Sequence, residues 1–249
     1  MRASDGNADV FPDLDALSHA AAEACVAAAR EAVEARGSFA LCLTGGSTPR
    51  PLYELLAGPY APQVPWQKTR LFWGDERYVP PDRDESNYGM ARAALIDRVT
   101  VPEDQVHPMP TDRDDPGEAA EVYEKTLRGF ANRWGAGTPL FDLLLLGLGA
   151  DGHVCSLFPE DEPHQQGDAW VRAPYGPPRH APRRRLTLTL PALAKAQNTL
   201  FLVSGEAKRE AVRAVLREGD PEMPATHVRA RQSARWLLAG AAAPSGVAR

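Results

Sequence analysis

The sequence predicts an α/β fold in which helices flank a doubly wound, mostly parallel sheet. Short apolar segments alternate with helical patterns along the chain, which is typical of strands joined by crossover helices. One apolar run, Leu143–Leu146, is too short for a buried helix and predicts a central parallel strand covered on both faces. We find no internal repeat and no linker, so we expect a single domain spanning residues 1–249.

The composition excludes several classes of function. Hydrophobic residues make up 43% of the 249 residues and charged residues 24%, which is ordinary for a globular protein. The net charge of −5 lacks the basic surplus of a nucleic-acid binder, although a local basic cluster can still bind a small anion. Because no apolar run reaches the length of a membrane span and the N-terminus lacks a signal-peptide pattern, we expect a cytoplasmic protein without a membrane partner. Three cysteines without a CxxC pair indicate reduced thiols.

The first predicted elements form a helix followed by a strand–turn–helix unit. The alanine-rich helix Asp13–Arg36 has an aspartate able to cap its start and Gly37 placed to end it. The apolar strand Phe39–Leu43 leads into the turn Thr44–Pro49, whose hydroxyls can cap a helix that follows with leucines at helical spacing. Free N–H groups at such a turn make a ready anion site.

The later segments continue the alternation. Arg70–Gly74 predicts a strand, while Ser86–Arg98 and Asp115–Trp134 predict helices that begin with capping residues. Glu160–Pro182 is rich in proline, glycine and charge, which predicts a long surface segment with one short strand at Ala169–Arg172; such loops are more often functional than idle. The remaining predictions are a half-buried strand of alternating Leu and Thr, two more strands and a helix, at Leu186–Leu190, Thr199–Val203, Arg235–Leu238 and Glu206–Arg217.

Two strand-to-helix turns are candidates for phosphate binding. The turn Thr44–Pro49 places Gly45 and Gly46 directly after a strand, although it lacks the Walker spacing. Lys208 lies in the first turn of a later helix, where a cation opposes the helix dipole unless an anion lies nearby. A phosphate held jointly by both glycines, Ser47 and Lys208 removes that conflict. The alternatives are a plain capped helix and a solvated lysine.

His153 is the candidate general base. It follows the central strand within a glycine-rich turn, and imidazole is the side chain best matched to proton transfer near neutral pH. Asp151 lies two residues earlier, whereas Asp75 ends a neighbouring strand and can face His153 across the crevice, so either can orient the imidazole. Arg77 can stabilise a developing oxyanion or hold an anionic group. The alternative is a plain loop histidine.

We expect no cofactor and no metal ion at this turn. Gly147, Gly149 and Gly152 have the spacing of a dinucleotide fingerprint, but the adjacent Asp151 would oppose a pyrophosphate. No HxxxH or clustered Cys/His spacing indicates a metal site. We interpret Cys155 as a packed thiol and not as a nucleophile.

Five segments, taken in order, resemble the 6-phosphogluconolactonase family. They are LTGGSTP, WGDERYVP with SNYGMAR, GLGADGHVCSLFP, RLTLTLP and VSGEAKREAV, and they extend from about Leu41 to Trp236. The resemblance implies the modified Rossmann-like fold shared with glucosamine-6-phosphate deaminase and ribose-5-phosphate isomerase. It also implies metal-free hydrolysis of 6-phospho-D-glucono-1,5-lactone to 6-phosphogluconate in the oxidative pentose phosphate pathway, with a small sugar phosphate as partner.

The same resemblance assigns roles to individual residues. It implies that His153 is the catalytic histidine and that Lys208 binds the phosphate. It also implies a binding arginine just before the TLT strand. Arg185 matches this position, although the preceding Arg183 and Arg184 are alternatives for the same role. Together with the reasoning from the residues, the candidate catalytic set is His153, Asp75, Arg77 and Asp151. The candidate substrate- and phosphate-binding set is Gly45, Gly46, Ser47, Thr48, Asn87, Gly149, Gly152, Arg185 and Lys208.

Two other functions are alternatives to lactone hydrolysis. An amino-sugar phosphate deaminase–isomerase of the same fold carries a glutamate five residues after the histidine, where this chain has Phe158, which cannot transfer a proton. A non-catalytic sugar-phosphate-sensing module has no need of Asp75 and His153, which this chain retains. For the lactonase we expect a monomer or a weak homodimer.

Overall fold

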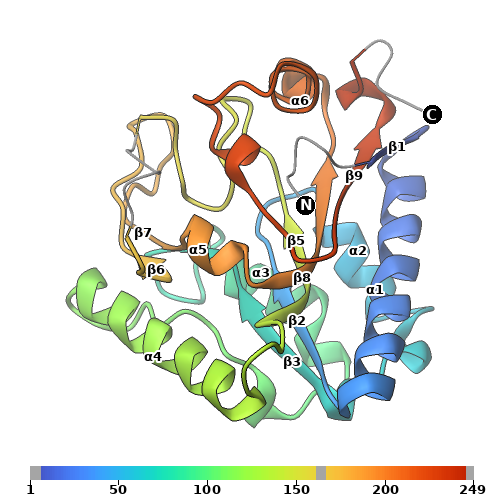
Figure 1. Cartoon of the computed structure of the whole chain (residues 1–249), viewed down its shortest axis with the longest axis vertical. Coiled ribbons are helices and arrows are strands. Elements are labelled where there is room, and N and C mark those ends of the chain that lie inside the picture. Colours follow the sequence, from blue (N-terminus) through green and yellow to red (C-terminus); the bar gives the residue numbers. More distant parts are fainter. Residues whose placement is uncertain (1–6, 161–166, 245–249) are drawn as a thin grey trace.

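Six parallel strands form the centre of the protein. The computed structural model describes residues 7–160 and 167–244. The strands lie in the order β1-β9-β8-β5-β2-β3, and every neighbouring pair runs parallel (Figure 1). Their bounds are Asn7–Phe11 (β1), Phe39–Leu43 (β2), Thr69–Trp73 (β3), Phe141–Leu146 (β5), Ala196–Val203 (β8) and Ser233–Ala239 (β9). The predicted mostly parallel, doubly wound sheet is confirmed.

Helices lie on both sides of this sheet in Figure 1. Their bounds are Leu14–Arg36 (α1), Arg50–Leu56 (α2), Asn87–Ala94 (α3), Pro116–Trp134 (α4), Leu190–Leu193 (α5) and Arg209–Arg213 (α6). On one side α1 packs against α2 and the sheet. On the other side α4 places Phe130 edge-on against Phe72 of β3, and its Tyr123 hydroxyl accepts a hydrogen bond from the backbone N–H of Trp73 at 2.9 Å.

The local signals at the first helix and at the apolar strands are confirmed. Asp13 caps α1 by accepting a hydrogen bond from the N–H of Ala16 at 2.8 Å, and Gly37 ends it with a φ of 75°. Every residue of β2 and of β5 is buried. The one carboxylate in β5, Asp142, accepts a hydrogen bond from the Ala40 N–H at 2.8 Å and pairs with an arginine at the end of α1.

A small antiparallel sheet lies beside the main one. Its order is β4-β7-β6, with bounds Asp75–Arg77 (β4), Arg185–Leu188 (β7) and Val171–Arg172 (β6). The short strand predicted inside the surface segment is therefore present, although residues 161–166 of that segment lie outside the described residues. The alternation of Leu and Thr predicts a half-buried strand, which is wrong: all of β7 is buried, because α4 packs on it and Thr187 Oγ1 accepts a hydrogen bond from the Ser156 N–H at 3.1 Å.

Three further features differ from the prediction. The edge strand β1 is missed because Asn7–Phe11 contains two polar residues and no apolar run. Helix α2 begins at Arg50, and Pro49 occupies its N-cap position without a side-chain hydrogen bond, so the hydroxyls of the preceding turn do not cap this helix. The helix predicted at 206–217 begins as a 3-10 turn, Glu206–Lys208, and ends as a π turn, Ala214–Glu218.

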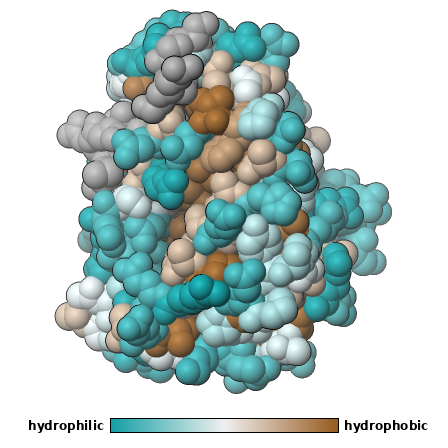
Figure 2. All heavy atoms as spheres, turned by 90° about the vertical axis from the view of Figure 1, so that its right-hand side faces the viewer, coloured by the Kyte–Doolittle hydropathy of each residue, from teal (hydrophilic) through white to brown (hydrophobic). Residues whose placement is uncertain are grey.

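The surface is mostly polar. Figure 2 shows the face on the right of Figure 1, where hydrophobic residues form a narrow, interrupted band between hydrophilic side chains. Among the described residues, the large hydrophobic side chains that stay exposed are Val10 and Tyr175. None of the described helices has both the length and the apolar composition that crossing a membrane requires.

Candidate active site

A cavity of about 350 Å³ lies at the carboxyl ends of β2, β5 and β8. The chain leaves β2 for β3 on one side and returns to β5 on the other, so the strand order reverses at this point. Open α/β sheets bind ligands at such a reversal. The turns after these three strands line the cavity, together with residues of β4 and β7. All candidate site residues line it except Asp151 and Gly152.

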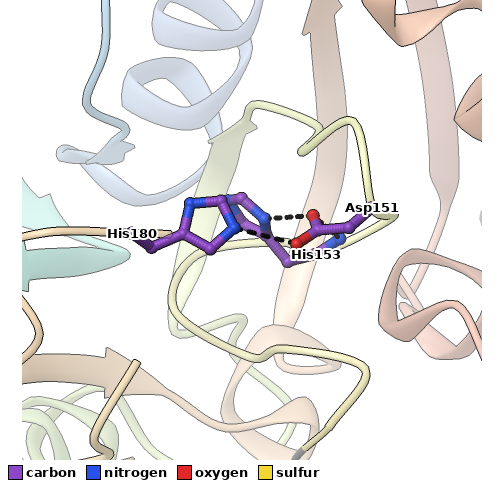
Figure 3. A group of neighbouring side chains, drawn as sticks. All are labelled: Asp151, His153 and His180. Carbon is purple, nitrogen blue, oxygen red and sulfur yellow. Dashed lines mark hydrogen bonds and ion pairs between the residues drawn. The ribbon is translucent and has the colours of Figure 1, made fainter. Parts of the chain in front are cut away.

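His153 and Asp151 form a close pair beside the cavity (Figure 3). The Nδ1 of His153 lies 2.6 Å from Oδ1 of Asp151. An ionised carboxylate only accepts hydrogen bonds, so Nδ1 carries the proton and the neutral imidazole keeps its lone pair on Nε2. Gly149 makes room for the pair, because a Cβ at this position would come within 3.0 Å of both side chains. The sequence left the orienting carboxylate open between Asp75 and Asp151; Asp151 is the one in contact with His153.

Two further cations or donors contact the same carboxylate. Nε2 of His180 lies 2.8 Å and Nη2 of Arg179 lies 2.9 Å from Oδ2 of Asp151. Burial by itself would raise the pKa of Asp151, but the hydrogen bonds from His153, His180 and Arg179 outweigh it and hold this pKa well below its ordinary value. Asp151 is therefore ionised near neutral pH.

Asp75 is committed to other partners. It is 6% exposed; its Oδ2 accepts a hydrogen bond from Ser156 Oγ at 2.8 Å, and its Oδ1 accepts one from Asn87 Nδ2 at 3.3 Å. The same amide nitrogen donates to the carbonyl oxygen of Asp75 at 2.9 Å. Gly45 permits this arrangement, because a Cβ there would overlap the Asn87 amide. Asp75, Asn87 and the glycine turn thus form one connected wall of the cavity.

Buried Glu76 holds the backbone of this wall together through hydrogen bonds. Its carboxylate accepts hydrogen bonds from the backbone N–H groups of Arg77, Asn87 and Tyr88, each at 2.7 Å. Burial raises the pKa of Glu76 to about 7, against the lowering effect of these three hydrogen bonds and with a further increase from the neighbouring Asp75. The side chain ties the end of β4 to the start of α3, which carry Asp75, Arg77 and Asn87.

Two arginines face the cavity from adjacent strands. Arg77 and Arg185 are direct partners in the β4–β7 register, and both line the cavity. Burial lowers the pKa of Arg185, nearby Asp75 raises it, and Arg77 lowers it again. Among the three consecutive arginines, Arg185 is the one at the cavity, since Arg183 lies over the Tyr175 ring and Arg184 is exposed. Two like charges side by side favour an anion between them.

Lys208 lies across the cavity, in the 3-10 turn that follows β8. The side chain is half-buried, and burial lowers its pKa while the charge of Asp151 raises it. Gly152, by contrast, lies outside the lining: its φ is 80° and a Cβ would overlap the side chain of Met223. Gly152 therefore shapes the loop and does not approach the cavity.

The main residue that the sequence reasoning missed is His180. It lines the cavity 27 residues beyond His153, inside the surface segment whose length alone suggested a function. Asp151, His153 and His180 also form a group whose potential ligand atoms lie within 4.8 Å of one another, a grouping that sequence spacing could not indicate. Hydrogen bonds between these three side chains already account for their arrangement, and the charge of Arg179 on the same carboxylate disfavours a second cation.

Comparison with known proteins gives a consistent result. A family model described as glucosamine-6-phosphate isomerases/6-phosphogluconolactonase matches residues 12–237. The chain is 43% identical over 235 residues to the 6-phosphogluconolactonase of Mycobacterium tuberculosis, covering 92% of this chain and 94% of that protein. It is 42% identical over 210 residues to the one of Synechocystis sp., covering 84% and 85%. The crystal structure of 6-phosphogluconolactonase from Thermotoga maritima superposes with a TM-score of 0.81 at 31% identity, covering 94% of this chain and 99% of that one.

Proposed function

The chain belongs to the family of glucosamine-6-phosphate isomerases and 6-phosphogluconolactonases, and from this premise we propose how its site works. The protein is the lactonase of that family: it hydrolyses 6-phospho-D-glucono-1,5-lactone to 6-phosphogluconate, a reaction of the pentose phosphate pathway. The observation that carries the mechanism is the His153–Asp151 pair, whose proton placement leaves the lone pair of His153 on Nε2 at a cavity with three cationic side chains.

The cationic side of the cavity supports a phosphate-binding role. Lys208, Arg77 and Arg185 supply positive charge, and the backbone of the turn at residues 44–49, which includes Ser47 and Thr48, supplies N–H and hydroxyl groups. Anchoring the phosphate holds the lactone carbonyl beside His153 and makes the attack effectively intramolecular.

The hydrolysis then needs one base that becomes an acid. His153 Nε2 takes a proton from water as the water oxygen bonds to C1, and the carbonyl oxygen becomes an oxyanion that Arg77 or backbone N–H groups stabilise. When the oxyanion collapses, the bond between C1 and the ring oxygen breaks, and the imidazolium of His153 gives its proton to that oxygen. The product acid ionises to 6-phosphogluconate. Asp151 keeps the proton of His153 on Nδ1 and stabilises the imidazolium.

Phe158 distinguishes this reaction from deamination and isomerisation. It lies five residues after His153, is buried, and packs its ring against His180 with the ring centroids 5.0 Å apart. A hydrocarbon ring cannot transfer a proton, so the site lacks the carboxylate with which the deaminases of this fold open the amino-sugar ring, and this favours hydrolysis.

We also infer that the protein acts in the cytoplasm as a single-domain monomer or weak homodimer. All three cysteines are free thiols, and Cys25 and Cys42 are buried, where burial raises both pKa values. Such unpaired thiols suit a reducing compartment. Sedimentation at several protein concentrations gives the oligomeric state, and a stable tetramer would contradict this inference.

A coupled assay with freshly generated lactone tests the function. The rate of 6-phosphogluconate formation should exceed spontaneous hydrolysis, and His153→Ala should lose about 100-fold or more of the enzymatic rate, since it removes the acid–base group. Binding of 6-phosphogluconate, measured by calorimetry, should persist in that variant because the cationic residues remain. Near-normal turnover by His153→Ala would contradict the assignment, and no acceleration by the wild type would leave a sugar-phosphate-sensing module as the better explanation.

A further inference from the structure

The carboxylate of Asp151 is shared between two histidines. One oxygen accepts the Nδ1–H of His153 at 2.6 Å, and the other lies 2.8 Å from Nε2 of His180 (Figure 3). As the carboxylate only accepts, Nε2 of His180 carries a proton as well. Each oxygen of the Asp151 carboxylate thus accepts a hydrogen bond from a different imidazole.

His180 is held in place by its surroundings. Its backbone oxygen accepts a hydrogen bond from Nη2 of the buried Arg185 at 2.9 Å, and its backbone N–H donates to the carbonyl of Pro177 at 2.9 Å. Its ring stacks on Phe158 with centroids 5.0 Å apart and meets the ring of His153 edge-on at 4.8 Å. The side chain is 26% exposed, so its contact with Asp151 belongs to the packed wall of the cavity.

We propose that His180 is a positioning residue for lactone hydrolysis, acting through Asp151 on the orientation and basicity of His153. This inference rests on the function proposed above. Oδ2 of Asp151 has two donors, the half-exposed Arg179 and the less exposed, ring-stacked His180. A carboxylate held on Oδ2 by the packed imidazole presents a more fixed acceptor to Nδ1 of His153 than one held there by the solvated guanidinium alone. The N–H of His180 also draws charge from the carboxylate, which limits how strongly Asp151 stabilises the imidazolium form of His153.

The charged groups that face this bridge are Arg179 and Glu160 from the same side of the cavity and Lys208 from the turn after β8. Arg179 and Glu160 pair at 2.5 Å, and their side chains are 48% and 52% exposed, so solvent screens both. His180 is the least exposed donor on Oδ2 of Asp151. Changing His180 alone leaves these charges in place, so a shift in the pH profile reports on the bridge.

Two substitutions separate the hydrogen bond from the packing. His180→Phe keeps a ring for stacking on Phe158 but removes the N–H, whereas His180→Gln loses the ring but can place an amide N–H near the former Nε2. We expect His180→Phe to lower kcat about 10-fold, as for loss of a hydrogen bond to a charged group, and to move the acid-side midpoint of the kcat/KM profile upward by roughly half a pH unit or more. His180→Gln should stay within about threefold of the wild type with an unmoved midpoint.

A packing role predicts the reverse order, with His180→Phe tolerated and His180→Gln impaired, and that result would overturn the proposal. His19→Phe is the matched control, because His19 bonds to the Tyr60 hydroxyl from α1 and should leave rate and profile unchanged. Two-bond proton–nitrogen NMR of the His153 ring gives a readout that needs no turnover. Identical His153 titrations in wild type and His180→Phe would refute the bridge even if the protein proved not to be a lactonase.

Discussion

One added methyl group at Gly149 should disrupt the His153–Asp151 pair and, with it, the proposed proton transfer. A Cβ at this position would come within 3.0 Å of the His153 ring and of the Asp151 carboxylate, closer than side-chain atoms approach one another. Gly149 is not among the glycines with positive φ, so its backbone accepts alanine without strain. The methyl must therefore displace the side chains. The added Cβ would lie 2.0 Å from Nδ1 of His153, and an ordinary contact needs about 3.5 Å, so the ring must move by about 1.5 Å.

The size of the effect follows from the geometry. A shift of that magnitude breaks the 2.6 Å bond between Nδ1 and Oδ1, and a hydrogen bond to a charged group contributes about 1.5–3 kcal/mol, which corresponds to about 10- to 150-fold in rate. Misplacing a catalytic group by about 1 Å costs a similar factor of about 100. We therefore expect Gly149→Ala to lower kcat about 100-fold while the free energy of unfolding falls by only about 1–3 kcal/mol, as in other overpacked sites.

The assay is the coupled lactone assay combined with urea unfolding. Gly147→Ala, two residues earlier in the same turn, is the control for folding, since its Cβ would meet no atom within 4 Å and should change the free energy of unfolding by less than about 1 kcal/mol. A folded Gly149→Ala protein with turnover within threefold of the wild type would refute the role of the His153–Asp151 contact.

Two further predictions concern the wall of the cavity. The pKa of Glu76 is about 7 in the folded protein against an ordinary value of 4.5, so between these pH values the folded state binds more protons than the unfolded state. The free energy of unfolding should therefore fall by up to about 3 kcal/mol as the pH rises from 4.5 to 7. Urea unfolding should show this pH dependence in the wild type and not in Glu76→Gln, and the same pH dependence in both proteins would contradict it. Ser156→Ala removes a hydrogen-bond donor from the buried Asp75 carboxylate and should lower the free energy of unfolding by about 1–3 kcal/mol. The control is Ser18→Ala, because Ser18 is a buried serine of α1 that bonds within its own helix, and it should lower this free energy by less than about 1 kcal/mol. The reverse order would refute the Asp75 network.

Local signals explain why much of the fold could be predicted. Strand β2 has the predicted bounds, and α1 begins and ends at the predicted capping residues, because apolar runs, Asp13 and Gly37 act on their immediate neighbours. Strand β1 had no such signal. Its register against β9 and the 2.7 Å pair between Asp9 and Arg235 join residues 226 positions apart, and only the folded chain brings them together.

The site likewise contains residues that local sequence patterns indicated and one that they could not. The strand-end motifs indicated His153, Asp75 and Lys208, because the carboxyl ends of parallel strands meet at one edge of the sheet. His180 could not be found this way, since it reaches the cavity from an irregular segment whose path depends on buried Arg185 and on the rings it packs against. No local pattern encodes that approach.

The choice between Asp75 and Asp151 shows what the glycines of the site are for. The sequence analysis placed Gly45 and Gly149 in the substrate- and phosphate-binding set, but a Cβ at either position would collide first with the protein's own side chains. Gly149 donates its N–H to the His153 carbonyl at 2.8 Å and so folds the turn back until Asp151 and the imidazole meet. Asp75 has other partners: Asn87, whose amide fills the space beside Gly45, donates to its carbonyl and carboxylate oxygens, and Ser156 donates to the carboxylate as well. We therefore expect substitutions at either glycine to act through the side chains that they displace and not through lost contacts to substrate.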